Sequence, residues 1–147
     1  RLSGPFLDRF DLSLEVPSLP PGMLSQPLPI TESSATVRAR VILTRQRQLA
    51  RAGTLNALMS HQQVRQWCQL AAEDACWLEE VLHQLGLSIR AWQRILKVAR
   101  RLADMESCEA ILRKQLQEGV SYRGMGRLLH RLQKERAMKK ERKHEET

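Results

Sequence analysis

The clearest helical pattern in the chain is Ser88-Ile89-Arg90-Ala91-Trp92-Gln93-Arg94-Ile95-Leu96-Lys97-Val98-Ala99-Arg100. At 100° per residue, Ile89, Trp92, Ile95, Leu96 and Ala99 fall within an arc of roughly 140° that also includes Leu102 and Ala103. Ser88 stands at the expected N-cap position, where its hydroxyl can accept a hydrogen bond from a free backbone N–H. The pattern predicts an amphipathic helix with one packed face and a basic flank of Arg90, Arg94, Lys97 and Arg101.

The sequence on either side of this helix also reads as helical. Apolar spacing, Gly53 as a stop signal and Ser60 as a cap predict helices over about 35–52, 60–70, 71–85 and 108–122. Phe, Tyr and Trp make up 4% of the chain, and strand-type runs are scarce after residue 16. These features predict a mainly α fold.

The first 34 residues have a different composition. Alternating residues in Asp11-Leu12-Ser13-Leu14-Glu15-Val16 predict a short half-buried strand. Five prolines then lie within 13 residues, at positions 17, 20, 21, 27 and 29, which favours an extended connector. We therefore divide the chain into a strand segment, a linker, a helical domain and a basic helical tail expected to be partly disordered, over 1–16, 17–34, 35–123 and 124–147.

The net charge of +8 is unevenly distributed. Five arginines and no acid lie between residues 38 and 51, and Arg40, Arg47 and Arg51 fall within roughly 40° of one another on a helical wheel. Such a basic edge suits phosphates, so these three arginines are candidate nucleic-acid contacts.

Several other chemistries find no support in the residues. The histidines are scattered, so no metal site is predicted, and Cys68, Cys76 and Cys108 are expected to be buried free thiols. No phosphate-binding G-x-x-x-x-G-K-[ST] loop and no apolar run of membrane-spanning length occurs. Because the chain starts at Arg1 inside a motif, we expect it to be part of a longer, cytoplasmic polypeptide.

Two segments resemble AAA+ ATPases of the magnesium-chelatase and MCM-helicase branch. Gly4-Pro5-Phe6-Leu7-Asp8-Arg9-Phe10-Asp11-Leu12 is similar to their arginine-finger segment, and the helix after Ser88 is similar to their sensor-2 lid helix. The resemblance implies that Arg9 acts in trans on a neighbouring subunit's ATP and that Arg90 contacts the γ-phosphate, with Arg94 as a further nucleotide-binding candidate. Without it, Arg9 could simply pair with Asp8 or Asp11, and Arg90 could face solvent or pair with Glu73.

Shorter landmarks in the same order resemble the YifB/ComM subfamily of these ATPases and extend the similarity to residue 123. They include Val16-Pro17-Ser18-Leu19-Pro20, Val37-Arg38-Ala39-Arg40-Val41, Gln48-Leu49-Ala50-Arg51, Leu55-Asn56, Val98-Ala99-Arg100, Leu102-Ala103-Asp104 and Ser121-Tyr122-Arg123. Arg101 departs from the family's usual A-R-T, and the tail after Arg123 matches nothing.

The resemblance implies a helical lid that serves a homo-oligomeric, hexameric ring, with ATP and Mg²⁺ bound by the full-length protein. The fragment alone is expected to hold no cofactor and to be inactive, since it lacks the Walker motifs. DNA branch migration or helicase activity in competence and recombination is the expected output. Alternatives are a stand-alone basic module that binds nucleic acid, and an ATPase subunit of magnesium chelatase.

Overall fold

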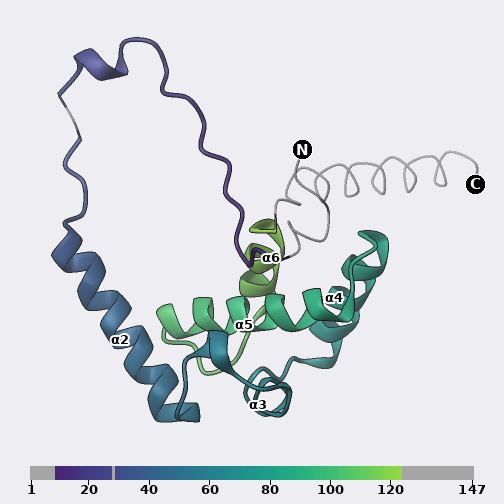
Figure 1. The fold of residues 1–147 in the computed structure, drawn as a ribbon. Helices are drawn as coiled ribbons and strands as arrows, with labels where there is room; N and C mark the ends of the chain where they lie inside the picture. The colour runs from purple at the N-terminus through teal and green to yellow at the C-terminus, as the bar shows by residue number, and fades with distance from the viewer. Residues whose placement is uncertain (1–8, 28, 124–147) are drawn as a thin grey trace, which may run out of the picture.

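The computed structural model describes residues 9–27 and 29–123. Its elements are, in order, η1 (Met23–Ser25), α2 (Ser34–Ala52), η2 (Asn56–Leu58), α3 (His61–Trp67), α4 (Ala72–Gln84), α5 (Ile89–Met105) and α6 (Arg113–Ser121). Helix α5 lies at the centre, between α2 on one side and α4 on the other (Figure 1). The described residues contain helices and no strand, so the predicted mainly α fold is confirmed.

The predicted strand over residues 11–16 is wrong. Within the described residues, Ser13 forms an isolated parallel bridge with Arg123, while the apolar side chains of Leu12, Leu14 and Val16 remain exposed. A strand needs a partner along its length, and this segment meets one only at Ser13. The connector beyond it arches away from the bundle before reaching α2 (Figure 1).

Helix boundaries near α2 and α3 follow the sequence signals. The Ser33 hydroxyl accepts a hydrogen bond from the Thr36 N–H at 3.2 Å, and Gly53 ends α2 in a left-handed conformation with φ of 67°. At α3, Ser60 and Gln63 cap each other reciprocally at 3.0 and 3.2 Å. Ser88 precedes α5 as predicted, but within the described residues its side chain makes no capping hydrogen bond.

Helix α6, the last within the described residues, begins later than the sequence predicts, at Arg113 rather than near Cys108. The side-chain oxygen of Gln115 accepts a hydrogen bond from the Leu112 backbone N–H at 2.7 Å and so caps the first turn. The preceding loop is held in place by Arg100, as described below. Helical periodicity alone could not reveal this tertiary contact.

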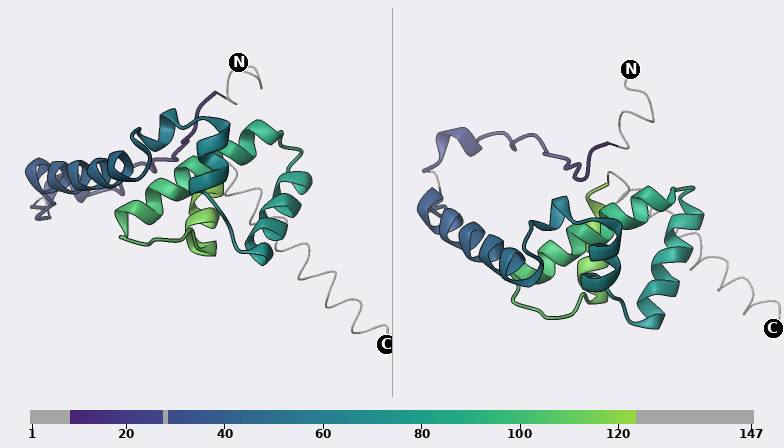
Figure 2. Two further views of the ribbon diagram at one scale, coloured as in Figure 1. Left: turned by 90° about the horizontal axis from the view of Figure 1, so that it is seen from below. Right: turned by 60° about the horizontal axis from the view of Figure 1, so that its bottom comes forward.

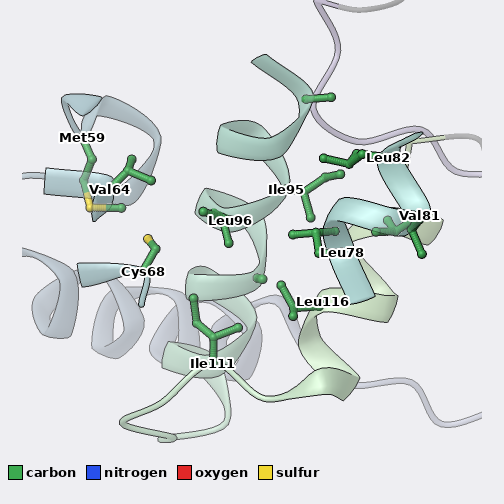
Figure 3. Packing of buried hydrophobic residues seen from close by; sticks show 13 residues of the cluster. Met59, Val64, Cys68, Leu78, Val81, Leu82, Ile95, Leu96, Ile111 and Leu116 are labelled. Carbon is green, nitrogen blue, oxygen red and sulfur yellow. The ribbon is translucent and has the colours of Figure 1, made fainter. Parts of the chain in front are cut away.

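The core surrounds α5 (Figure 3). Met59, Val64 and Cys68 approach Leu96 from one side, whereas residues of α4 and α6 cover Ile95 from the other, including Leu78, Leu82 and Leu116.

Two details of residue burial differ from prediction. Ile89 is 80% exposed, whereas Ala91 is buried, so the packed face is rotated at the first turn. Cys68 is buried as predicted, but Cys76 is exposed and Cys108 is half-buried.

Helix α2 projects from this bundle (Figure 2). Its buried residues are polar, Thr44 and Gln48, and both lie in its C-terminal half. Val37, Ile42 and Leu43 nearer its start are exposed. The bundle therefore holds α2 mainly at its C-terminal end.

Candidate functional site

The predicted site residues of α5 lie on the half of the helix that follows Ser88. Arg90 is exposed in the first turn, and it forms no ion pair with Glu73 or another acid of the described residues. Arg94, one turn later, is half-buried, and its Nη1 lies 3.3 Å from Oδ1 of Asp11. The two arginines thus have different surroundings although they belong to one basic flank.

Residues 9–14, which we call the finger segment, lie against α5 and the end of α6. The backbone N–H of Ser13 donates a hydrogen bond to the Tyr122 carbonyl oxygen. Leu12 and Leu14 line one wall of a groove of about 470 Å³, and Val98 and Leu102 of α5 contribute to the opposite wall. Arg9 itself is exposed, in a turn at the start of the described chain.

Arg9 and Arg90 are each near in sequence to one member of the Asp11–Arg94 ion pair. Arg9 precedes Asp11 by two residues, a reach of about 7 Å in an extended chain, and Arg90 precedes Arg94 by one helical turn of about 5.4 Å. The structure therefore brings the finger segment and the first half of α5 together. Sequence spacing alone could not establish this proximity.

A second polar cluster joins α2 to the C-terminal end of α5, and we call it the Asp104 hub. The Asp104 carboxylate, 2% exposed, accepts hydrogen bonds from Arg51 and from the Asn56 side-chain amide, the latter at 2.8 Å, and lies 3.2 Å from Arg100. The Asp104 backbone carbonyl accepts another from Arg47 at 2.6 Å. Buried charge is tolerated here because each carboxylate oxygen has a partner.

The hub reaches further through Gln48 and Arg100. The side-chain oxygen of Gln48 accepts a hydrogen bond from the Asn56 backbone N–H at 3.0 Å. Arg100 donates to the carbonyl oxygens of Cys108 and Glu109, each at 2.6 Å, and so fixes the loop before α6. Burial lowers the pKa of Arg100 while Asp104 raises it, and the guanidinium remains charged because its pKa is so high.

The three candidate nucleic-acid contacts do not form one open basic edge. Arg40 is exposed and pairs with Glu32 at 2.7 Å. Arg47 and Arg51 turn toward Asp104 and line a recess of about 550 Å³ beside the hub. Arg47 and Arg51 would have to leave Asp104 before contacting a phosphate. Of the three candidate arginines, only Arg40 is exposed.

No metal centre or membrane span is found in the described part of the chain. Residues 9–27 and 29–123 contain no group of three or more His, Cys, Asp or Glu side chains able to hold a metal ion. The residues present do not fit a magnesium site, and we assign none of them as a ligand. No helix within these ranges is both long and apolar enough to cross a membrane.

The fold and the order of its elements define the class of protein. Residues 31–123 match the family described as magnesium chelatase, subunit ChlI C-terminal, and the chain belongs to this family. Its helical bundle is the C-terminal lid of a magnesium-chelatase-like AAA+ protein.

Individual relatives narrow the class to YifB- and ComM-like members. The chain is 59% identical over 134 residues to the uncharacterized protein YifB of Escherichia coli, and 58% identical over 134 residues to YifB of Salmonella typhimurium. It is 48% identical over 132 residues to the competence protein ComM of Haemophilus influenzae. These matches cover 90–91% of this chain but 26% of each relative. The chain thus spans about a quarter of their length.

Proposed function

We propose that this region serves a ring-forming AAA+ ATPase, with Arg9 as the arginine finger that reaches a neighbouring subunit's ATP and Arg90 as the sensor-2 residue. The observation that carries the proposal is the placement of the finger segment against α5, which leaves both arginines exposed. Two exposed guanidinium groups, each within four residues of a member of the Asp11–Arg94 pair, suit an anionic ligand at a subunit boundary.

For ATP hydrolysis, Arg9 and Arg90 need to supply only a positive charge in the correct position. As the bond to the γ-phosphate breaks, negative charge spreads over its equatorial oxygens, and a planar guanidinium can bridge two of them. A finger supplied by the neighbouring subunit makes hydrolysis depend on assembly. In related phosphoryl-transfer enzymes such a group contributes a factor of about 10³ to 10⁵ in rate.

We place the ATPase in the cytoplasm as a hexameric ring that drives DNA branch migration or unwinding in competence and recombination. The name of the competence protein ComM, 48% identical to this chain, supports the biological setting. The exposed Arg40 and its basic neighbours on α2 support contact with a phosphate backbone. Arg47 and Arg51 are secondary contacts that require rearrangement of the hub.

The test uses a full-length polypeptide that carries an ATPase core ahead of this region. Arg9→Ala and Arg90→Ala should each lower kcat for ATP, by about 10³-fold for Arg9, while circular dichroism stays unchanged. Arg65→Ala, at an exposed arginine on α3, is the matched control. Mixing Arg9→Ala subunits with subunits that lack the Walker A lysine should restore part of the turnover, since each supplies what the other lacks. Unchanged turnover in both arginine variants would refute the assigned roles.

A further inference from the structure

We infer that Arg94 is a positioning residue: its ion pair with Asp11 holds the finger segment against α5, so that Arg9 and Arg90 are presented together. This inference rests on the proposed function. It gives Arg94 a different task from direct nucleotide binding, which is the role that the sequence resemblance implies.

The first argument comes from the contacts of the finger segment. Its contacts with α5 and α6 include the Asp11–Arg94 pair at 3.3 Å, the Ser13–Tyr122 hydrogen bond with the bridge at Arg123, and the walls of the groove. Leu12 and Leu14 are 53% and 69% exposed, so apolar burial alone anchors the segment weakly. A charged anchor next to Arg9 therefore matters more than it would in a well-packed strand.

The second argument is electrostatic. The Asp11 carboxylate offsets part of the charge of Arg94, and a phosphate would have to displace Asp11, just as it would displace Glu32 from the more exposed Arg40. The side chains of Arg94 and Asp11 are 34% and 54% exposed. An exposed pair of this kind shifts an equilibrium by a factor of about five at most. We therefore expect Arg94 to bias the docking of the finger segment, and not to be essential for the fold.

The test is a charge swap, read out first by hydrogen exchange in the present chain. Asp11→Arg and Arg94→Asp should each speed exchange of the Ser13 amide by about fivefold or more, because each replaces attraction by repulsion. The double variant should return the exchange rate to within about twofold of the parent. Arg65→Asp on α3 makes the same change in net charge as Arg94→Asp and should leave this amide unaffected.

The second readout is ATP turnover of the full-length polypeptide with the same variants. Each single reversal should lower kcat with little change in KM, and the swap should restore kcat. Recovery of Ser13 protection without recovery of turnover would overturn the positioning role, since Arg94 would then act on the phosphate itself. Equal Ser13 exchange in all variants would overturn it as well. If Arg9→Ala and Arg90→Ala leave turnover intact, the proposed function fails, whatever the exchange data show about the ion pair.

Discussion

The side-chain amide of Asn56 donates a hydrogen bond to Asp104 Oδ2 at 2.8 Å, across 48 residues of sequence. Together with Arg51 and Arg100, it surrounds a carboxylate that is almost fully buried. This arrangement ties the end of α2, the turn that follows it and the end of α5 into one unit. The fold of the lid therefore depends on a polar contact as well as on its apolar core.

Replacing Asp104 should destabilise the chain strongly. Asp104→Ala leaves Arg51 and Arg100 with uncompensated buried charge, so the free energy of unfolding should fall by about 3–5 kcal/mol. Urea denaturation monitored by circular dichroism would measure the change. Glu32→Gln removes the acid of the exposed Arg40 pair and should cost less than about 1 kcal/mol. Similar losses in both variants would contradict a structural role for the hub.

At Gly119 we expect a substitution to leave the free energy of unfolding unchanged or to raise it. A Cβ built on this buried glycine of α6 would lie 3.5 Å from the Ile95 carbonyl oxygen and 3.7 Å from Val98 Cγ1, which is ordinary packing distance. Gly119→Ala should thus leave stability unchanged or raise it by up to about 1 kcal/mol through helix propensity. Gly119→Leu, which must push Ile95 aside, should cost about 1–3 kcal/mol. A clear loss of thermal stability in the alanine variant would contradict the spacing between α5 and α6 at Gly119.

The cysteines should differ in reactivity. Burial raises the pKa of Cys68 to about 11, with nearby Arg100 opposing the shift. In the native chain at neutral pH, iodoacetamide should modify the exposed Cys76 first and Cys68 only after unfolding, since the thiolate is the nucleophile. Mass spectrometry of peptides after timed labelling would test the order. Equal labelling of both thiols would show that the core around Cys68 opens readily.

Cys68 should also make stability depend on pH in the alkaline range. Its pKa is higher in the folded state, about 11, than the ordinary value of 9.0, so the native state keeps the proton longer. The thiol's contribution is complete below pH 9 and is lost as pH rises toward 11, by a total on the order of 2 kcal/mol. The difference in unfolding free energy between wild type and Cys68→Ala should shrink over this range. A constant difference would refute the shift.

Binding of DNA to α2 should depend on Arg40 more than on Arg51. Arg40→Ala should weaken binding of a DNA duplex and reduce the slope of log K against log salt by about one, while stability stays within about 1 kcal/mol. Arg51→Ala should instead lower the free energy of unfolding, because Arg51 is part of the Asp104 hub. Fluorescence anisotropy at several salt concentrations would separate the two. A salt slope unaffected by Arg40→Ala would exclude this arginine as a phosphate contact.

Local signals predicted the helices well because their causes are local. The Ser60 cap, Gly53 in the left-handed region and the apolar repeat of α5 all act within one or two turns. Where tertiary contacts decide, prediction failed. The loop before α6 depends on Arg100, and residues 11–16 form no strand because, in the described residues, their only β-bridge is at Ser13.

The Asp104 hub was missed for the same reason. Its members are separated by up to 57 residues, and no periodic pattern links them. A signal was nevertheless present, since Gln48, Arg51, Asn56, Arg100 and Asp104 all lie in the short landmarks that resemble the YifB/ComM subfamily. Polar residues that recur in such landmarks indicate side chains with hydrogen-bond partners elsewhere in the fold. The roles of Arg9, Arg90 and Arg94 stay predictions that only the experiments above can decide.

The attachment of α2 at one end gives it the mechanics of a lever. From Gln48 at the hub to Ser34 at the free end, the helix measures roughly 20 Å at 1.5 Å per residue. A rotation of roughly 10° about the hub would move its start by about 3–4 Å, with no change in the apolar core. The buried Asp104 then lies at the pivot of this rotation. Small displacements of the hub near α5 would produce larger displacements of α2 where the connector enters it.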